Sequence, residues 1–411
     1  MNNTPWRSGN HIELLINGDE FFPRAFSAID AAREEVLIET FIWRDDAAGR
    51  ELHTRLIAAA ERGVRVEVLV DGYGTDQLSP AFIAALAEAG VRLLAFDPRP
   101  KLLGVRTNLF RRLHRKLLVV DGQLGFVGGI NFCADHYLDH GPMAKQDYAV
   151  QVSGPIASDL HQASLALMNA HGRPLAPLAP WLKRVPLQAD SASARIQLAI
   201  RDNQRHRDDI EEQYLAAIDQ AQERVVIANA YFFPSYRLLR ALREAARRGV
   251  AVTLLLQGMP DMPLVRLCSR LLYNYLLRDG VNIREYTQRP LHGKVALIDQ
   301  RWATVGSSNL DPLSLSLNLE ANLFIDDAAF NARLAEHLDE LLREHSKPIT
   351  LERVLRGYWW RAPLIFLCFH FLRHFPAWIG LLPAHSPTLK PWPAANDQAA
   401  AGAGLPGEGR A

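Results

Sequence analysis

The feature that most constrains this chain is a segment that it contains twice, at residues 114–131 and 292–309. Five residue types recur at the same spacing: His114, Lys116, Asp121, Gly128 and Asn131 in the first copy, and His292, Lys294, Asp299, Gly306 and Asn309 in the second. At about one residue in twenty for each type, five such matches over ~400 starting points arise by chance in roughly one chain in ten thousand. The segment is therefore a duplicated motif, and neither histidine is interpreted as an ordinary core residue.

Each copy predicts a short buried strand directly after its lysine. Residues 117–120 and 295–298 are apolar, and both runs are followed by a turn signal. Side chains alternate faces along a strand, so His114 and Lys116 project to one side and Asp121 projects to the other. The second copy repeats this alternation. A histidine and a lysine on one face suit an anion, whereas the two aspartates are predicted to be internal anchors.

Helical and strand patterns alternate along the chain, which predicts the α/β fold class. The two halves also match outside the motif, because Ala28-Ile-Asp30 corresponds to Ala217-Ile-Asp219. We therefore predict two similar domains, residues 1–170 and 196–346, related by a pseudo-twofold axis with both motifs at their interface.

Three segments lie outside these domains. Residues 171–195 contain four prolines among small and polar residues and are predicted to be a linker. Residues 347–383 are predicted to form an amphipathic, membrane-associating segment. Residues 384–411 are rich in proline, alanine and glycine and are predicted to be disordered.

The composition narrows the classes of function. With 46 basic and 45 acidic residues, the chain lacks the global basic field of a nonspecific nucleic-acid binder, so no nucleic-acid partner is expected. The three cysteines are scattered without metal-ligand spacing, which fits a reducing cytoplasm. The amino-terminal residues lack an apolar run, so no secretory signal is predicted.

The first motif is preceded by a basic stretch. Residues 99–116 contain seven lysines and arginines and no acidic residue. A solvated loop is the common explanation of such a stretch, but this one leads directly into His114. We interpret it as an electropositive approach suited to anionic headgroups.

Two histidines and two lysines that converge on one anion suit phosphodiester chemistry without a metal or cofactor. One histidine attacks phosphorus to form a phosphohistidine while the other protonates the departing alkoxide, and these roles reverse when an acceptor hydroxyl attacks. The predicted ligands of the non-bridging oxygens are Lys116, Lys294, Asn131 and Asn309. Asp147 and Glu320, each at the start of a predicted strand, are expected to orient the imidazoles. No cluster of acids, cysteines and histidines has metal-ligand spacing, so no metal is predicted.

The paired H-x-K-x4-D segments, each followed by G-x-x-N, resemble the phospholipase D superfamily. The resemblance extends to the bacterial cardiolipin synthases of the B type over about residues 6–390, through passages such as Glu39–Trp43, Asp71–Gly74 and Gly306–Leu315. It implies two α/β domains, each a mixed sheet flanked by helices, and transfer of a phosphatidyl group between two phosphatidylglycerol molecules with release of glycerol. It also implies a peripheral protein at the cytoplasmic face of a bacterial inner membrane, with anionic phospholipid as its partner. By the same resemblance, His114 is the nucleophile.

The first copy departs from the pattern of the superfamily at one position. It reads Gly128-Gly129 where the second reads Gly306-Ser307. The Ser307 hydroxyl, expected near the phosphate or a histidine, has no counterpart in the first half, so the two halves are predicted to be inequivalent. Two alternatives are a hydrolase of phospholipid or nucleic-acid phosphodiesters and a catalytically idle membrane-binding protein. The intact motifs in both halves count against the idle protein.

The predicted membrane contact is the aromatic stretch at residues 358–382. A bilayer span needs about 20 consecutive apolar residues, and basic residues and prolines interrupt this run. We therefore expect it to lie in the interface, with its aromatic rings at the headgroup boundary and its basic residues toward anionic lipid. The alternative is that it packs against the second domain.

Overall fold

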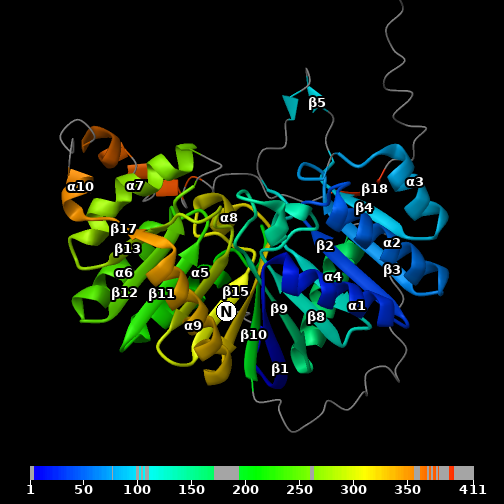
Figure 1. The fold of residues 1–411 in the computed structure, drawn as a ribbon, viewed down its shortest axis with the longest axis horizontal. Helices are drawn as coiled ribbons and strands as arrows, with labels where there is room; N and C mark the ends of the chain where they lie inside the picture. Colours follow the sequence, from blue (N-terminus) through cyan, green and yellow to red (C-terminus); the bar gives the residue numbers. More distant parts are fainter. Residues whose placement is uncertain are drawn as a thin grey trace, which may run out of the picture.

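The computed structural model describes residues 4–75, 77–98, 101–102, 105–106, 111–170, 194–259, 263–355, 362–367, 370–371, 374–375, 378 and 388–392. They form two lobes of similar construction, residues 4–170 and 194–349, which lie on either side of the molecule (Figure 1). The predicted α/β class is confirmed. The predicted linker at 171–195 lies outside the described residues except for its last two, which begin the first strand of lobe 2.

Seven equivalent strands of each lobe belong to one sheet. The strands of lobe 1 are β1 (Arg7–Ile16), β2 (Glu35–Thr40), β3 (Arg65–Asp71), β4 (Arg92–Phe96), β7 (Leu117–Val120), β8 (Leu124–Gly128) and β9 (Tyr148–Ser153). Those of lobe 2 are β10 (Ala194–Arg201), β11 (Arg224–Asn229), β12 (Ala251–Gln257), β13 (Asn282–Tyr286), β14 (Lys294–Ile298), β15 (Trp302–Gly306) and β16 (Glu320–Asp326). A separate short pair, β5 (Lys101–Leu102) and β6 (Val105–Arg106), lies in the basic stretch before the first motif.

The strand order repeats outward from the centre of the sheet. It runs β1-β9-β8-β7-β2-β3-β4 in lobe 1 and β10-β16-β15-β14-β11-β12-β13 in lobe 2. The first strand of each lobe, β1 or β10, pairs antiparallel with the other at the centre. The outer three strands of each lobe are parallel and the remaining neighbours are antiparallel. The sheet is therefore mixed, and its symmetry is the pseudo-twofold that the repeat predicts.

Helices cover both lobes. Lobe 1 has α1 (Asn17–Ala31), α2 (Ala47–Glu61), α3 (Pro80–Glu88) and α4 (Pro155–Ala170), with the short turns η1 (Ala134–His136) and η2 (Leu138–His140). Lobe 2 has α5 (Asp209–Gln220), α6 (Tyr236–Arg247), α7 (Pro263–Leu277), α8 (Pro312–Ser316) and α9 (Ala328–Glu344). Side-chain caps begin several of them: Ser79 accepts the N–H of Phe82 and Ser235 accepts the N–H of Leu238.

The sheet folds over where the lobes meet. Cα atoms of β8 come within 8 Å of those of β16, whereas strands four places apart in a flat sheet lie about 19 Å apart. Helices α4 and α9 pack at this fold, and one core cluster includes residues of both lobes: Leu14, Leu160, Leu198, Leu323 and Leu338. The lobes therefore share a hydrophobic core, which fixes the relative positions of the two motifs.

The carboxyl-terminal segment returns to lobe 1. After β17 (Ser346–Pro348) pairs with β13 and α10 (Leu351–Leu355) follows, β18 (Leu389–Pro391) pairs with β4 at the far edge of lobe 1 (Figure 1). The predicted disorder from residue 384 is therefore wrong for residues 388–392, because the open edge of β4 offers backbone donors and acceptors that composition does not reveal. The remainder of that tail, and much of the predicted segment 347–383, lie outside the described residues. In the part of the chain that the structure describes, no helix combines the length and hydrophobicity needed to cross a bilayer.

Candidate active site

Main-chain hydrogen bonds join each motif to the opposite lobe. The N–H of His114 donates to the carbonyl oxygen of Leu319 at 2.9 Å, and the N–H of His292 donates to that of Gln146 at 2.8 Å. Leu319 and Gln146 each directly precede one of the predicted orienting acids. These bonds therefore bring the acid of one lobe beside the histidine of the other.

The histidine–carboxylate pairs cross between the lobes. Nδ1 of His114 lies 2.9 Å from Glu320 Oε2, and Nδ1 of His292 lies 2.6 Å from Asp147 Oδ2. Both carboxylates are fully buried. A carboxylate only accepts, so each imidazole donates its Nδ1–H and carries its lone pair on Nε2. The pairs thus set one tautomer, with the nucleophilic nitrogen turned away from the acid.

Both motif lysines are buried beside their histidines. Nζ of Lys116 donates to the carbonyl oxygen of His114 at 2.7 Å, and Nζ of Lys294 donates to that of His292. Burial lowers the pKa of Lys116 to about 7, although Glu320 favours its charged form and Lys294 opposes it. The effect of Lys294 on the pKa of Lys116 indicates that both motifs contribute to one site.

Burial and nearby cations also act on the histidines. Burial lowers the pKa of His114 to about 4, with Lys116 and Lys294 lowering it further and Glu320 opposing them. Burial, followed by Lys294, Lys145 and Lys116, holds the pKa of His292 well below its ordinary value. Without a bound anion, both imidazoles are therefore neutral at pH 7, and each Nε2 can act as a nucleophile or base. A bound phosphodiester supplies the negative charge that favours their protonation.

Burial tends to raise the pKa of Glu320, but its interactions outweigh burial. The charge of His114, its hydrogen bond, Lys116 and Ser307 all favour the ionised form, and the pKa is lowered. Glu320 is therefore a carboxylate, as the tautomer of His114 requires.

The motif aspartates lie directly after the motif strands, at the end of each strand away from its histidine. The carboxylate of Asp121 accepts the backbone N–H groups of Arg33, Glu34 and Glu35, and that of Asp299 accepts those of Gln222, Glu223 and Arg224. Both aspartates have positive φ, 52° and 51°. Each aspartate therefore ties the turn after its motif strand to the start of the neighbouring strand.

The asparagines and Ser307 are buried at the same site. Asn131 Oδ1 accepts the N–H of Ile42 at 3.1 Å, so its amide nitrogen is the end that can donate to a phosphate oxygen. Asn309 Oδ1 is buried and has no hydrogen-bond partner. The hydroxyl of Ser307 donates to Glu320 Oε2 and so contacts the acid of His114, not its own motif's histidine.

Sequence reasoning missed two groups that support the site. Asp71 Oδ2 accepts the N–H of Leu113, next to His114, at 2.8 Å, and Gln257 Oε1 accepts the N–H of Leu291, next to His292, at 3.1 Å. Both residues end the third strand of their lobes. Their equivalent positions in the repeat could have identified both residues from the sequence. Asp71 was instead interpreted only as part of the turn that follows it.

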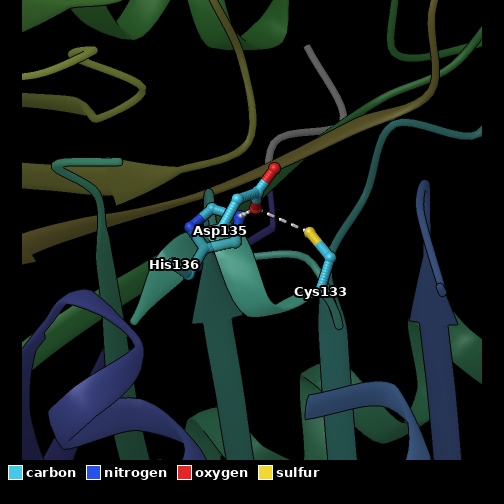
Figure 2. Close-up of side chains that lie close together, drawn as sticks. All are labelled: Cys133, Asp135 and His136. Carbon is cyan, nitrogen blue, oxygen red and sulfur yellow. Dashed lines mark hydrogen bonds and ion pairs between the residues drawn. The ribbon is translucent and has the colours of Figure 1, made fainter. Parts of the chain in front are cut away.

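The other missed residue is His136, which belongs to a cluster with Cys133 and Asp135 (Figure 2). The three side chains could approach one metal ion, but their interactions do not fit one. The Asp135 carboxylate already contacts Lys145 at 2.8 Å and Arg44 at 3.4 Å, and burial raises the pKa of the Cys133 thiol. The Nε2 lone pair of His136 accepts the N–H of Asn131. We therefore assign no metal to this cluster.

The fold and the crossed site agree with a sequence-family match. The PLD-like domain of cardiolipin synthase matches the chain twice, at residues 26–154 and 214–342, so both lobes are covered. The chain belongs to this family of PLD-like cardiolipin synthases, which are phosphatidyltransferases.

Individual relatives extend the match over the chain. Cardiolipin synthase B of Salmonella typhimurium is 53% identical over 387 residues, 93% of each chain, and cardiolipin synthase B of Escherichia coli K12 is 52% identical over the same share. Among solved structures, phosphatidylserine synthase of Haemophilus influenzae superposes with a TM-score of 0.67 at 15% identity, over 89% of this chain and 97% of that one. The structural match supports the fold alone.

Proposed function

We propose that this protein transfers a phosphatidyl group from one phosphatidylglycerol to another, which forms cardiolipin and releases glycerol. The observation that carries the proposal is the crossed pairing, in which each motif histidine donates Nδ1–H to a buried carboxylate of the opposite lobe. This arrangement leaves two Nε2 atoms for one phosphodiester. The high identity to cardiolipin synthases B is the reason for proposing phosphatidylglycerol as the substrate.

In the first half-reaction, the Nε2 lone pair of His114 attacks phosphorus of the donor lipid. A P–N bond forms, and the bond from phosphorus to the oxygen of the headgroup glycerol breaks. The protonated Nε2 of His292 gives its proton to that oxygen, which releases free glycerol. Lys116 and Lys294 are placed to stabilise the non-bridging oxygens, and the amides of Asn131 and Asn309 are further candidates.

In the second half-reaction, neutral His292 takes the proton from the terminal glycerol hydroxyl of a second phosphatidylglycerol. The resulting alkoxide attacks phosphorus, the P–N bond breaks, and His114 is regenerated. Glu320 and Asp147 hold the two imidazoles in one tautomer and favour the imidazolium when it forms. Asp121 and Asp299 act only through the backbone that they anchor.

We further propose that the protein works as a peripheral protein at the cytoplasmic face of a bacterial inner membrane. Its substrates are lipids whose acyl chains stay in the bilayer, so the enzyme must dock beside them. Side chains available for docking lie in the carboxyl-terminal segment, where Phe366 and Leu367 are 70% and 60% exposed and Trp378 is 45% exposed. Phe371 stacks on Phe233 at 6.4 Å and joins this patch to lobe 2.

The test of function is product analysis with purified protein and phosphatidylglycerol vesicles labelled in the headgroup and the acyl chains. The proposal requires equal amounts of cardiolipin and free glycerol. Phosphatidic acid as the sole lipid product would replace the transferase with a hydrolase, because water would then be the acceptor.

The test of docking uses substitutions, since cutting the chain after Lys347 would sever β17 and remove β18. Phe366→Ser combined with Leu367→Ser should reduce sedimentation with phosphatidylglycerol vesicles severalfold while preserving activity on a short-chain soluble substrate. Met143→Ser, which removes an exposed apolar side chain of lobe 1, is the matched control. Unchanged sedimentation of the double variant would show that this patch is not the anchor.

A further inference from the structure

The two carboxylates of the site have different second contacts. Glu320 bonds His114 and also accepts the hydroxyl of Ser307. The equivalent of Ser307 in lobe 1 is Gly129, where a Cβ would lie 2.2 Å from Asp147 Oδ1. A side chain at position 129 would therefore displace the Asp147 carboxylate from its present position, and glycine itself offers no donor equivalent to the Ser307 hydroxyl.

His136 lies beside Asp147 from a different direction. It is fully buried at the end of η1, and its Nδ1 lies 3.6 Å from Asp147 Oδ2. The same oxygen bonds Nδ1 of His292 at 2.6 Å, and the two imidazole centroids are 5.7 Å apart. One carboxylate oxygen thus faces two imidazoles.

The proton of His136 points toward that carboxylate. Nε2 of His136 accepts the N–H of Asn131 at 3.2 Å, so the neutral ring carries its proton on Nδ1. Nδ1 is buried and has no hydrogen-bond partner. Burial lowers the pKa of His136 to about 3, with Lys145 and His292 lowering it and Asp147 and Asp135 opposing them, so the ring is neutral. A buried N–H that lacks a partner is stabilised by approaching a carboxylate.

We propose that His136 is a positioning residue whose Nδ1–H steadies Asp147 for His292, as the Ser307 hydroxyl steadies Glu320 for His114. The inference rests on the proposed two-histidine mechanism. At 3.6 Å the contact is longer than a hydrogen bond, and hydrogen bonds of catalytic sites often shorten when substrate binds. His136 therefore supplies in lobe 1 the donor that Gly129 cannot.

This role has an electrostatic consequence. Facing two imidazole N–H groups, Asp147 attracts the proton of His292 less strongly than an unshared carboxylate would. Loss of the His136 donor concentrates the charge of Asp147 on His292 and raises its proton affinity. The other groups that face His292 are unaltered by that loss: Lys294, Lys145, Lys116 and His114.

Two amide substitutions separate the two contacts of His136. Asn places a donor near the position of Nδ1, so His136→Asn keeps the N–H toward Asp147. Gln places an oxygen near Nε2, so His136→Gln keeps the acceptor for the N–H of Asn131 and loses the donor. Ser307→Ala is the matched change on the other carboxylate.

The readout is the titration of each histidine, followed by NMR in the full-length protein labelled with ¹⁵N-histidine. His136→Gln should raise the midpoint of His292 by about 0.5 to 1 pH unit, a three- to tenfold gain in proton affinity, and leave His114 unchanged. His136→Asn should restore the wild-type midpoint, and Ser307→Ala should move His114 alone. A folded His136→Gln variant with an unmoved His292 would overturn the proposal.

A second measurement needs no variant. In the wild-type protein the ¹⁵N shifts of His136 should place its proton on Nδ1, and a proton on Nε2 would overturn the proposal even if His136→Gln failed to fold. Neither measurement depends on turnover. A protein that forms only phosphatidic acid would therefore contradict the proposed function without deciding the role of His136.

Discussion

In lobe 1 a carboxylate, Asp71, accepts the N–H next to the motif histidine, and in lobe 2 an amide, Gln257, accepts the corresponding N–H. The backbone geometry is the same in both lobes, but the charge is not. Burial raises the pKa of Asp71 to about 6, and its charge favours the protonated form of Lys116. The duplicated scaffold therefore retains its hydrogen bonds while the electrostatics of the two halves differ.

A second difference lies inside the motif strands. Arg115, between His114 and Lys116, is buried 3.7 Å from Glu39, whereas the corresponding pair in lobe 2 is Gly293 and Ala228. A Cβ at Gly293 would lie 2.5 Å from the ring of Tyr148, so lobe 1 occupies that space from across the interface. The halves thus pack asymmetrically around one site, which suits two histidines with different tasks.

The largest effect should come from removing either histidine. His114→Ala and His292→Ala should each lower turnover by a factor of about 10³ or more, because each imidazole performs a step that the other cannot. The assay is cardiolipin formation, with thermal melts to establish that both variants fold. A single variant that keeps more than a tenth of wild-type activity would contradict the paired site.

The same pair tests the assignment of roles. If His114 is the nucleophile, only His292→Ala can still form a phosphohistidine, trapped by acid quench and mapped by peptide analysis. Phosphate found on His292 would exchange the roles of the two lobes.

Removing the charge of the orienting acids should have the next largest effect. Asp147→Asn and Glu320→Gln should each lower turnover by about 10²- to 10³-fold, because an amide can hold the wrong tautomer and does not stabilise the imidazolium. Crossed pairing predicts that Glu320→Gln chiefly slows formation of the phosphohistidine, through the nucleophile His114. Asp147→Asn should slow both formation and breakdown, because His292 is the acid of the first half-reaction and the base of the second. Rapid-quench kinetics would separate the two steps, and the opposite assignment would indicate pairing within each lobe.

The sequence does not predict that each motif histidine pairs with the acid of the opposite lobe. Repeat matching and hydrophobic periodicity suffice for the α/β lobes and the pseudo-twofold, since these depend on local patterns. Asp121 lies in a turn with positive φ after the strand, so strand alternation does not decide its orientation. Which acid meets which histidine depends on how the sheet folds over at β1 and β10, and no local pattern records that packing.

The sequence alone predicts that the two halves of the site differ, but it does not show why they differ. Gly129 in place of a serine indicates inequivalent halves, but the reason is the Asp147 carboxylate 2.2 Å from any Cβ there. His136 has no counterpart in the repeat, so nothing in the sequence alone directed attention to it. The strand β18 was missed because its partner edge lies about three hundred residues earlier in the chain.

Removing the charge of Asp71, the last residue of the third strand in lobe 1, should have a moderate effect on the free energy of unfolding, and this effect should depend on pH. The folded pKa of Asp71, about 6, exceeds its ordinary value of 3.8, so the folded state binds the proton more tightly. The stability from this group is present below pH 4 and is lost as pH rises through 6. The unfolding free energy of wild type, relative to Asp71→Asn, should therefore fall by about 2 to 3 kcal/mol between pH 4 and 7.

Urea unfolding at several pH values measures this difference. Asp71→Asn also loses one hydrogen bond, but that cost is independent of pH and does not alter the slope. Gln257→Glu is the mirror control: a carboxylate introduced in lobe 2 should add a second loss of stability with rising pH to the one that Asp71 causes in wild type. Parallel curves for wild type and Asp71→Asn would contradict the raised pKa.

The smallest effect, and the one expected to be equal in both lobes, concerns the motif aspartates. Asp121→Asn and Asp299→Asn should each lower the unfolding free energy by about 1 to 2 kcal/mol, because one of three backbone N–H groups loses its acceptor. Asparagine tolerates positive φ, so the change isolates the hydrogen bond from backbone strain. Activity should fall only as far as the melting curves shift. A variant in either lobe that melts like wild type but is inactive would mean that the aspartate of that lobe acts on the phosphate directly, contrary to its position at the end of the motif strand away from the histidine.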